Sequence, residues 1–210
     1  MQEMFQNPPS TKDRLVNAAR ELFWSNGFEA TSLSDILEKA DANAGSLYYL
    51  FKTKEELLLA VLDQYVDLMW PILLDPIYAR TEDPFERIFG LLDGYRQALI
   101  MTGCTYGCPI GSLAMELGDR LPRARVKIAE NFKNWRDAVR QNLEAAADRL
   151  PTSVDRTQLS TFVLTTMEGG VMQSRAHQNL EPFDTSVSQL MNYFSLLIAQ
   201  AAEEKKLRLQ

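Results

Sequence analysis

Cysteine and histidine are nearly missing from this chain of 210 residues, which has two cysteines, Cys104 and Cys108, and one histidine, His177. Two cysteines are too few, and these two are too close in sequence, to form a disulfide scaffold. They also do not complete a zinc site, because His177 has no further ligand at metal spacing. The sequence has no phosphate-binding loop and no serine–histidine–aspartate framework. We therefore expect no metal, no cofactor and no enzymatic activity.

Long apolar runs and an excess of positive charge are missing too. No stretch approaches the apolar length of a membrane span, and residues 1–10 are polar with no basic start, unlike a signal peptide. A cytoplasmic protein without membrane contact is the economical interpretation. The net charge of −6 argues against broad, nonspecific coating of nucleic acid. It leaves room for a small DNA-reading surface on an acidic body.

What is there is helical periodicity, and no stretch alternates with the period of a strand. Ser10 or Thr11 can cap a first helix, and Thr31 or Ser32 a second. The expected helices cover residues 11–26, 32–40, 44–50, from about 53 to beyond 68, 84–101, 109–117, 122–149, 155–178, and 184 to the C-terminus. The predicted fold class is all-α, with about nine helices.

The second and third of these helices, residues 32–40 and 44–50, are short, joined by about three residues, and expected to pack on the first. This is the arrangement of a helix-turn-helix, whose second helix enters the major groove of DNA. Leu47 would face the core, and the small and tyrosine side chains around it would face outward. On spacing alone two interpretations stay open, namely a DNA-reading helix and tyrosines that are partly core beside a solvated lysine turn.

Residues 11–62 resemble the DNA-binding domain of the TetR family of bacterial transcriptional regulators. The matching pieces are "AARELFWSNGFEAT", the following helix, and "GSLYYLFKTKEELL", and together they cover about fifty residues without a gap. The resemblance implies an all-α homodimer that binds a double-stranded DNA operator and an unknown small-molecule effector. It implies a helix-turn-helix domain at residues 10–56, with the motif itself at 32–51, and a ligand-binding and dimerisation domain at 57–210.

The resemblance also implies which residues contact DNA, either at the start of the second helix, on the third helix, or just after it. They are Thr31, Ser32, Asn43, Ala44, Gly45, Ser46, Tyr48, Tyr49 and Lys54. Asp41 departs from the family because a glycine is usual in this turn, and an Asx interaction could hold the turn instead. Residues 1–56 hold 6 Lys+Arg and 9 Asp+Glu, a net charge of 6 − 9 = −3. DNA affinity would then rest on a few placed contacts, with a modest salt dependence.

Aromatic and sulfur-bearing side chains are dense in the C-terminal part of the chain. Some would line the pocket for a small molecule, although plain core packing explains such a set equally well. The candidates are Tyr65, Met69, Trp70, Tyr95, Cys104, Cys108, Met115, Phe132, Trp135, Phe162 and Met167.

Residues 102–122, "TGCTYGCPIGSLAMELGDRLP", are the most distinctive segment after the motif. The "G-C-P-x-x-x-L-A-x-E" run is similar to one in a subset of the family, in which it borders the ligand pocket. Cys108 would cap a helix that begins at Pro109, and the helix dipole would lower its pKa and make it reactive. Cys104 could then resolve an oxidised Cys108. The alternative is that both thiols are small buried packing residues.

The last two expected helices are apolar on more than one face, which is typical of helices that pack both on their own domain and on a partner chain. In the family these helices form the dimer interface. The candidates here are Met172, Ala176, Leu190, Tyr193, Phe194 and Leu197. A dimer would place two reading helices about one DNA turn apart, which matches a palindromic operator.

Two functions follow from these expectations. The first is a ligand-responsive transcriptional regulator, expected to be a repressor that releases DNA when a small molecule binds. The second is a helical small-molecule-binding protein or enzyme with a vestigial DNA-binding domain, which the acidic N-terminal charge balance favours.

Overall fold

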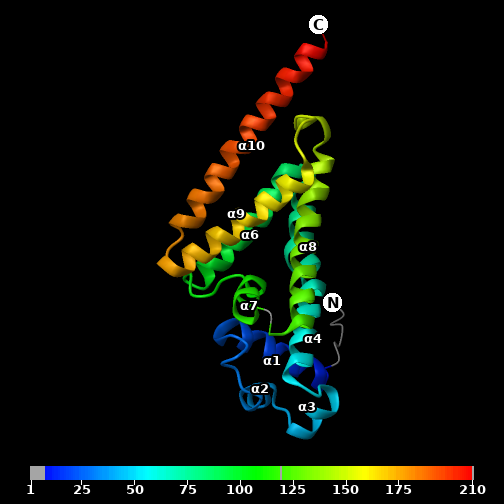
Figure 1. The fold of residues 1–210 in the computed structure, drawn as a ribbon, viewed down its shortest axis with the longest axis vertical. Coiled ribbons are helices and arrows are strands. Elements are labelled where there is room, and N and C mark those ends of the chain that lie inside the picture. The colour runs from blue at the N-terminus through cyan, green and yellow to red at the C-terminus, as the bar shows by residue number, and fades with distance from the viewer. Residues whose placement is uncertain (1–7, 119, 210) are drawn as a thin grey trace, which may run out of the picture. The chain divides into compact units, whose positions relative to one another are not determined.

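A computed structural model describes residues 8–118 and 120–209, and every regular element in this part of the chain is a helix (Figure 1). The all-α prediction is confirmed. The elements are α1 (Thr11–Asn26), α2 (Leu33–Ala40), α3 (Ala44–Leu50), α4 (Lys54–Leu68), the π-helix η1 (Met69–Leu74), α5 (Asp75–Arg80), α6 (Pro84–Met101), α7 (Pro109–Leu117), α8 (Pro122–Ala145), the 3-10 turn η2 (Ala147–Arg149), α9 (Arg156–His177) and α10 (Glu181–Arg208). Residues 1–7, most of the polar stretch interpreted above as unlike a signal peptide, lie outside the described part.

Side-chain caps fix where the first three helices begin. The Ser10 hydroxyl accepts the N–H of Asp13 at 3.2 Å, and the Asp13 carboxylate accepts the N–H of Ser10 at 3.1 Å. Ser32 and Asp35 form the same capping box before α2, and the Asn43 side chain caps α3. Each cap satisfies N–H groups that a helix leaves unpaired at its start. The sequence allowed Ser10 or Thr11 as the first cap and Thr31 or Ser32 as the second, and the structure has Ser10 and Ser32.

The chain divides into two compact units, each packed mainly within itself. The first unit holds the described residues of Met1–Tyr65 together with those of Ser112–Ile128, and the second holds Val66–Gly111 with those of Ala129–Gln210. The predicted boundary between residues 56 and 57 stays a prediction. Helices α4, α7 and α8 each contribute residues to both units.

The segments α4, η1 and α5 follow one another without a break over Lys54–Arg80. Two prolines lie inside this stretch, but neither ends it. Pro71 falls in the π-helical turn, and Pro76 falls in the first turn of α5. A proline in a first turn costs little because its missing N–H would be unpaired there anyway.

By length and composition alone, this 27-residue stretch could cross a membrane, since its most apolar window has a mean hydropathy of 1.6. The expectation that no stretch approaches that length was therefore wrong. Core packing accounts for part of this apolar character, because Leu57, Leu58, Val61 and Leu62 are fully buried in the first unit.

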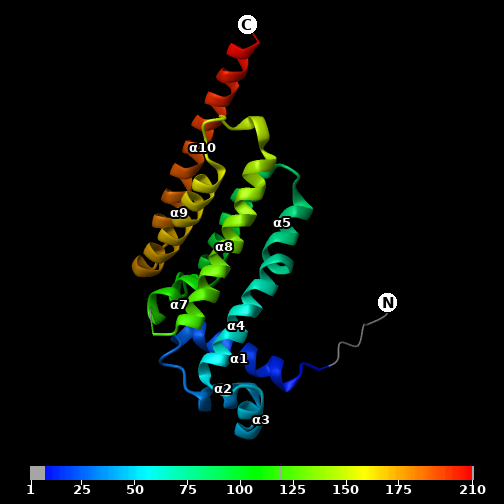
Figure 2. The same cartoon turned by 45° about the vertical axis from the view of Figure 1, so that its right-hand side comes forward.

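The second unit contains the antiparallel pair α9 and α10, which pack on each other, lie side by side in Figure 2, and diverge in Figure 1 away from the turn that joins them. The N-terminal turn of α10 packs tightly on α9 at Gly170, where an added Cβ would lie 3.2 Å from the Cα of Phe183. The Ser174 hydroxyl accepts the Phe183 N–H at 3.1 Å. Arg96 on α6 holds the same turn through a bidentate pair with Asp184, at 2.7 and 3.0 Å. The interpretation of Gly169-Gly170 as a packing feature is thus confirmed for Gly170.

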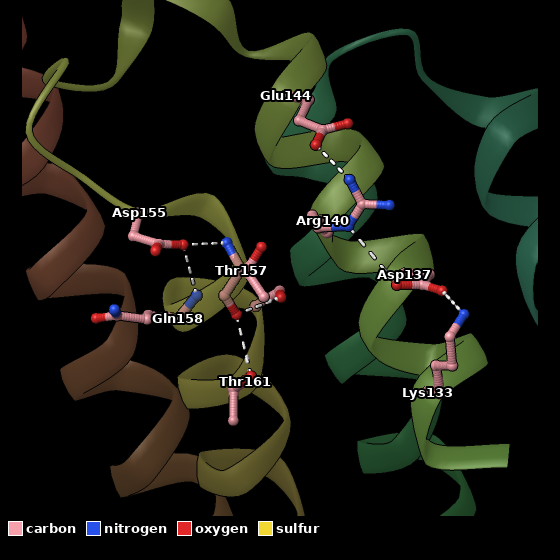
Figure 3. Close-up of polar contacts among 9 residues, drawn as sticks. Lys133, Asp137, Arg140, Glu144, Asp155, Thr157, Gln158 and Thr161 are labelled. Carbon is pink, nitrogen blue, oxygen red and sulfur yellow. Dashed lines mark hydrogen bonds and ion pairs between the residues drawn. The ribbon is translucent and has the colours of Figure 1, made fainter. Parts of the chain in front are cut away.

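Charged side chains spaced three and four residues apart stabilise the exposed face of α8 (Figure 3). Asp137 pairs with Lys133 at 2.6 Å and with Arg140 at 3.6 Å, and Arg140 also pairs with Glu144. Such pairs each add a few tenths of a kcal/mol to a helix. In the same view, Asp155 caps α9 by accepting two backbone N–H groups of its first turn.

Two predicted boundaries were wrong by a few residues. Helix α8 ends at Ala145 rather than residue 149, because Ala147 takes a φ of 46°, which a right-handed helix excludes. Helix α10 begins at Glu181 rather than residue 184, with Pro182 in its first turn. A proline there signals a helix start rather than a linker.

Candidate nucleic-acid interface

The turn between α2 and α3 is a left-handed C-cap at Asp41, with φ 46° and ψ 55°. The Asp41 N–H donates to the Glu38 carbonyl, and the Ala42 N–H donates to the Leu37 carbonyl. The Arg14 guanidinium on α1 donates to two further carbonyls, those of Ala40 at 3.0 Å and Asp41 at 3.1 Å. Backbone hydrogen bonds and Arg14 therefore hold the turn in which the family usually has glycine.

Helix α3 presents the expected face to solvent. Leu47 is fully buried, as predicted, whereas Asn43, Ala44 and Gly45 are exposed. Tyr49 has 82% of its surface exposed. An exposed tyrosine surrounded by small residues leaves the α3 backbone open to close approach by another molecule.

A shallow hollow lies along this face. It is lined by Thr11, Asn43, Gly45, Ser46, Tyr49 and Leu50. Tyr48 and Ser32 are exposed as well, and the Ser32 hydroxyl oxygen is already used as the cap of α2. Six predicted DNA contacts on α3 and its cap thus lie on one short helical segment.

Two predicted DNA contacts turn inward instead. Thr31 is 1% exposed, and its hydroxyl donates to the Gly27 carbonyl at 2.7 Å. The Lys54 ammonium donates to the Phe28 carbonyl and lies 4.3 Å from the centre of the Phe28 ring. Partial burial lowers the pKa of Lys54, and the nearby carboxylates of Glu29 and Glu116 oppose this effect. Both side chains bind carbonyls of the loop between α1 and α2, and their contact with phosphate stays a prediction.

Lys52 is an exposed cation just after α3. Its ammonium donates to the Tyr48 carbonyl at 3.1 Å, near the C-terminal end of that helix. A cation there is stabilised by the negative end of the helix dipole. The pattern "KTK" alone does not indicate which of its two lysines faces solvent.

Among the predicted pocket residues, three come together in the second unit. The Tyr95 hydroxyl lies 3.9 Å from the Cys108 sulfur, and the Tyr95 and Trp135 rings meet edge to face at 5.9 Å between centroids. Glu168 on α9 completes the group through a hydrogen bond to the Cys108 thiol. Burial raises the pKa of Glu168, which the Cys108 hydrogen bond partly offsets. Glu168 was missed, because a single glutamate inside a helical pattern usually marks a solvated position.

The remaining pocket candidates differ in the unit to which they belong and in their burial. Tyr65 and Met115 belong to the first unit, and Met115 is 82% exposed. Phe162 is exposed and meets Tyr193 edge to face, while Trp70 packs on Tyr78 with their rings tilted. The others differ in burial: Cys104 and Met167 are buried, and Met69 and Phe132 are half-buried.

Cys108 sits at the start of α7 as predicted, and its sulfur accepts the Gly111 N–H at 3.5 Å. Its electrostatics differ from the prediction. Burial strongly raises the pKa of the Cys108 thiol, and the charge of Glu168 raises it further. The N–H groups of Gly111 and Ile110 lower it only in part. The expectation of a lowered pKa was wrong, because desolvation outweighs the helix N-terminus at this site.

The predicted dimer residues divide between the protein interior and its surface. Leu190, Phe194 and Leu197 are buried within the single chain. Met172, Ala176 and Tyr193 are exposed. Further exposed apolar side chains occur on α10, including Met191 and Leu196.

Comparison with known proteins finds relatives of both the N-terminal and the C-terminal part of the chain. Residues 15–61 match the family described as "Bacterial regulatory proteins, tetR family", and residues 84–189 match "Transcriptional regulator LmrA/YxaF-like, C-terminal domain". The chain is 30% identical over 201 residues to the uncharacterized HTH-type transcriptional regulator Rv0196 of Mycobacterium tuberculosis, covering 93% of this chain and 98% of that one. It is 27% identical over 176 residues to the HTH-type transcriptional repressor ComR of Escherichia coli, covering 81% of this chain and 82% of that one.

A solved structure extends the likeness to the fold. The regulatory protein TetR from Rhodobacter sphaeroides is 21% identical and superposes with a TM-score of 0.75, covering 84% of this chain and 94% of that chain. The two matched family segments together span the helix-turn-helix and most of the second unit. The chain belongs to the TetR family of bacterial transcriptional regulators.

Proposed function

We propose that this protein is a repressor that binds operator DNA through α3 and releases it when a small molecule binds the second unit. The observation that carries the proposal is the exposed face of α3, which surrounds a fully buried Leu47 with small and hydroxyl-bearing side chains. The protein named ComR, to which this chain is similar, is a transcriptional repressor by its name. We propose a cytoplasmic location, as expected for a protein that acts on bacterial DNA.

The proposed contacts follow from which groups are exposed on α3 and beside it. Ala44 and Gly45 let the backbone approach base edges, and Ser46, half-exposed, offers a hydroxyl for base contact. The Tyr49 hydroxyl and the Lys52 ammonium are suited to phosphate oxygens, which fix register without reading sequence. Both lysine ammoniums donate to a backbone carbonyl, but Lys52 is exposed whereas Lys54 is half-buried, and we therefore add Lys52 to the proposed phosphate contacts.

For the effector, we propose a site at the Tyr95, Cys108, Trp135 and Glu168 group. Two aromatic rings supply apolar contact area, and a carboxyl, a thiol and a phenol supply hydrogen-bonding groups. Tyr95 and Glu168 are half-buried, so the group is not wholly enclosed in the core of the second unit.

For the assembly, we propose a homodimer through the exposed apolar face of α9 and α10. Its side chains include Phe162, Met172, Met191, Tyr193 and Leu196. Phe162 and Tyr193 meet edge to face across the two helices, and large exposed apolar patches on a protein typically mark interaction sites. A twofold dimer presents two α3 helices to two half-sites, which requires a palindromic operator.

The test compares two substitutions on α3, measured on the matched operator and on operators with single base changes. Tyr49→Phe removes a phosphate contact and should weaken binding on all of them by a similar factor. Ser46→Ala should instead change which base is preferred at one position of each half-site. If both variants bound every site as the parent does, α3 would not be the DNA-reading helix.

The alternative, a small-molecule-binding protein or enzyme with a vestigial DNA-binding domain, is favoured by the net charge of −3 over residues 1–56. It predicts ligand binding without any preference among DNA sequences.

A further inference from the structure

The loop between α1 and α2 has backbone N–H groups that no helix pairs, and one side chain accepts two of them. Glu116 on α7 accepts the Phe28 N–H through Oε2 at 2.9 Å and the Glu29 N–H through Oε1 at 2.7 Å. The carboxylate also lies directly against Gly27, where an added Cβ would come 3.0 Å from Oε2. Gly27 has a φ of 88°, so that both its conformation and its surroundings favour glycine. The loop is shaped around this carboxylate.

Other groups bind the same loop to its surroundings in the first unit. The Lys54 ammonium binds the Phe28 carbonyl. Arg120 pairs with the Glu29 carboxylate at 3.1 Å and donates to the Glu116 carbonyl at 2.8 Å. The loop leads directly into the Ser32 cap of α2, the first helix of the helix-turn-helix. A shift of the Glu116 carboxylate would therefore act on the segment that positions α2.

The opposite end of α7 is equally constrained, but in the second unit. The Gly111 N–H donates to the Cys108 sulfur, and a Cβ added to Gly111 would lie only 2.5 Å from Glu168 Oε2. The segment Val66–Gly111 belongs to the second unit, and the segment that follows it, Ser112–Ile128, contributes to the first. One helix of nine residues thus carries both Gly111, beside the proposed effector group, and Glu116 at the loop.

We infer that Glu116 is a positioning residue for DNA binding, which transmits displacements of α7 to the α1–α2 loop and so to α2 and α3. The link from α7 to the loop is argued from contacts within the protein, and only its effect on operator binding rests on the proposed function. It also gives a role to the final glutamate of the "G-C-P-x-x-x-L-A-x-E" run. A carboxylate is required because both its oxygens accept N–H groups, whereas a glutamine would turn an NH2 group toward one of them.

The first test needs no DNA. Gly111→Ala forces α7 and Glu168 apart at the far end of the helix, and the backbone amide signals of Phe28 and Glu29 are then followed by NMR, with their hydrogen-exchange rates. Both signals should shift in Gly111→Ala and be insensitive to the same change in a Glu116→Gln background. Gly169→Ala, where an added Cβ meets nothing within 4 Å, is the control and should leave them in place.

Because the far end of Glu168 could swing aside, Gly111→Leu provides a larger wedge. If neither variant moved the Phe28 and Glu29 signals, the inference would be overturned.

The second test is a double-mutant cycle on operator affinity with Gly111→Ala and Glu116→Gln. Charge differences between variants cancel in the cycle, so that only coupling remains. We expect Gly111→Ala to change operator affinity about 3- to 30-fold in the parent and by less than about twofold when Glu116 is replaced. Met115→Ala, at the exposed neighbour of Glu116 on the same helix, is the control. In a cycle with Gly111→Ala it should show no coupling, so that the two effects on operator affinity add. Additive effects of Gly111→Ala and Glu116→Gln would overturn the inference.

The two tests separate this inference from the proposed function. Shifted amide signals in a protein that binds no operator would support the α7 link and reject the repressor. Normal operator binding, with unmoved amide signals and additive effects on affinity, would support the repressor and reject the α7 link.

Discussion

The Lys54 side chain closes the α1–α2 loop by placing its ammonium on the Phe28 carbonyl and over the Phe28 ring. A hydrogen bond with a charged donor contributes about 1.5 kcal/mol or more to stability. Lys54→Met keeps the aliphatic stem and removes the charge, so we expect the free energy of unfolding to fall by about 1–2 kcal/mol. Urea denaturation measures this change.

Lys52→Met is the matched control, because this ammonium is exposed on the DNA-facing side of the chain. It should leave stability within about 0.5 kcal/mol of the parent and weaken operator binding instead. Equal loss of stability in the two variants would contradict the roles assigned to them.

The Cys108 thiol offers a second prediction at this scale. Burial and the nearby Glu168 raise its pKa, so that it stays protonated while a free cysteine ionises between pH 7 and 9. Its alkylation by iodoacetamide in the native protein should therefore be slow and nearly constant over that range. Mass spectrometry of the parent and of Cys108→Ser resolves this site from Cys104, which is buried too. An alkylation rate that rises with pH as for a free thiol would instead support the first expectation, that the Cys108 thiol is reactive.

Sequence reasoning succeeded where a residue's role is set by its immediate neighbours. Ser32 and Asn43 cap helices because short polar side chains can reach N–H groups two or three residues ahead. It did not identify the hydrogen-bond partners of Thr31, Lys54 and Glu116, because these partners are fixed by packing. The Glu116 carboxylate meets N–H groups 87 and 88 positions away in sequence, and no local pattern carries that information.

At the scale of helices, adjacent glycines on α9 do different things. An added Cβ at Gly170 would lie 3.1 Å from the Phe183 ring and 3.2 Å from its backbone, whereas at Gly169 it would meet nothing within 4 Å. Gly169→Ala should stabilise the protein by up to about 1 kcal/mol through helix propensity. Gly170→Ala should destabilise it by about 1–2 kcal/mol, because α10 must move away from α9.

Thermal and urea unfolding of these two variants give the sign directly. A gain of stability in both would show that α9 and α10 are less tightly packed at Phe183 than the structure has them.

The helices themselves were predicted well where apolar periodicity and caps agree, as in α6 and α9. The helix ends were predicted wrongly where a backbone conformation that the sequence does not indicate ends the helix, as at Ala147 with its positive φ. The continuity of Lys54–Arg80 was missed as well, because a π-helical turn accommodates Pro71 and proline usually indicates a break.

For the whole molecule, the sequence indicated two domains in succession, but the first compact unit also takes in residues 112–128. A discontinuous unit cannot be deduced from local patterns, since its later segment looks like any amphipathic helix. The dimer surface was only partly visible for a related reason. Apolar residues on α10 alternate between burial in the chain and exposure, and Leu197 falls on the buried side while Leu196 is 69% exposed.

The proposed dimer is tested with Leu196→Arg, which places a charge in an interface where it has no partner and should cost several kcal/mol of association. Sedimentation should show a folded monomer with weakened operator binding. Ile72→Arg, at an exposed apolar residue of η1, is the control and should remain dimeric. A dimer that persists in Leu196→Arg would place the interface elsewhere. Leu197→Arg does not test the question, because Leu197 lies inside the protomer.

The central claim is that α3 makes this protein a sequence-specific DNA-binding regulator. The most direct measurement is the affinity of the intact protein for the DNA upstream of its own gene, against scrambled DNA of the same length, at about 0.15 M salt. We expect a preference of about a thousandfold or more, as is typical of specific operator binding. Equal affinity for both DNAs would contradict the claim and favour a ligand-binding protein with a vestigial helix-turn-helix.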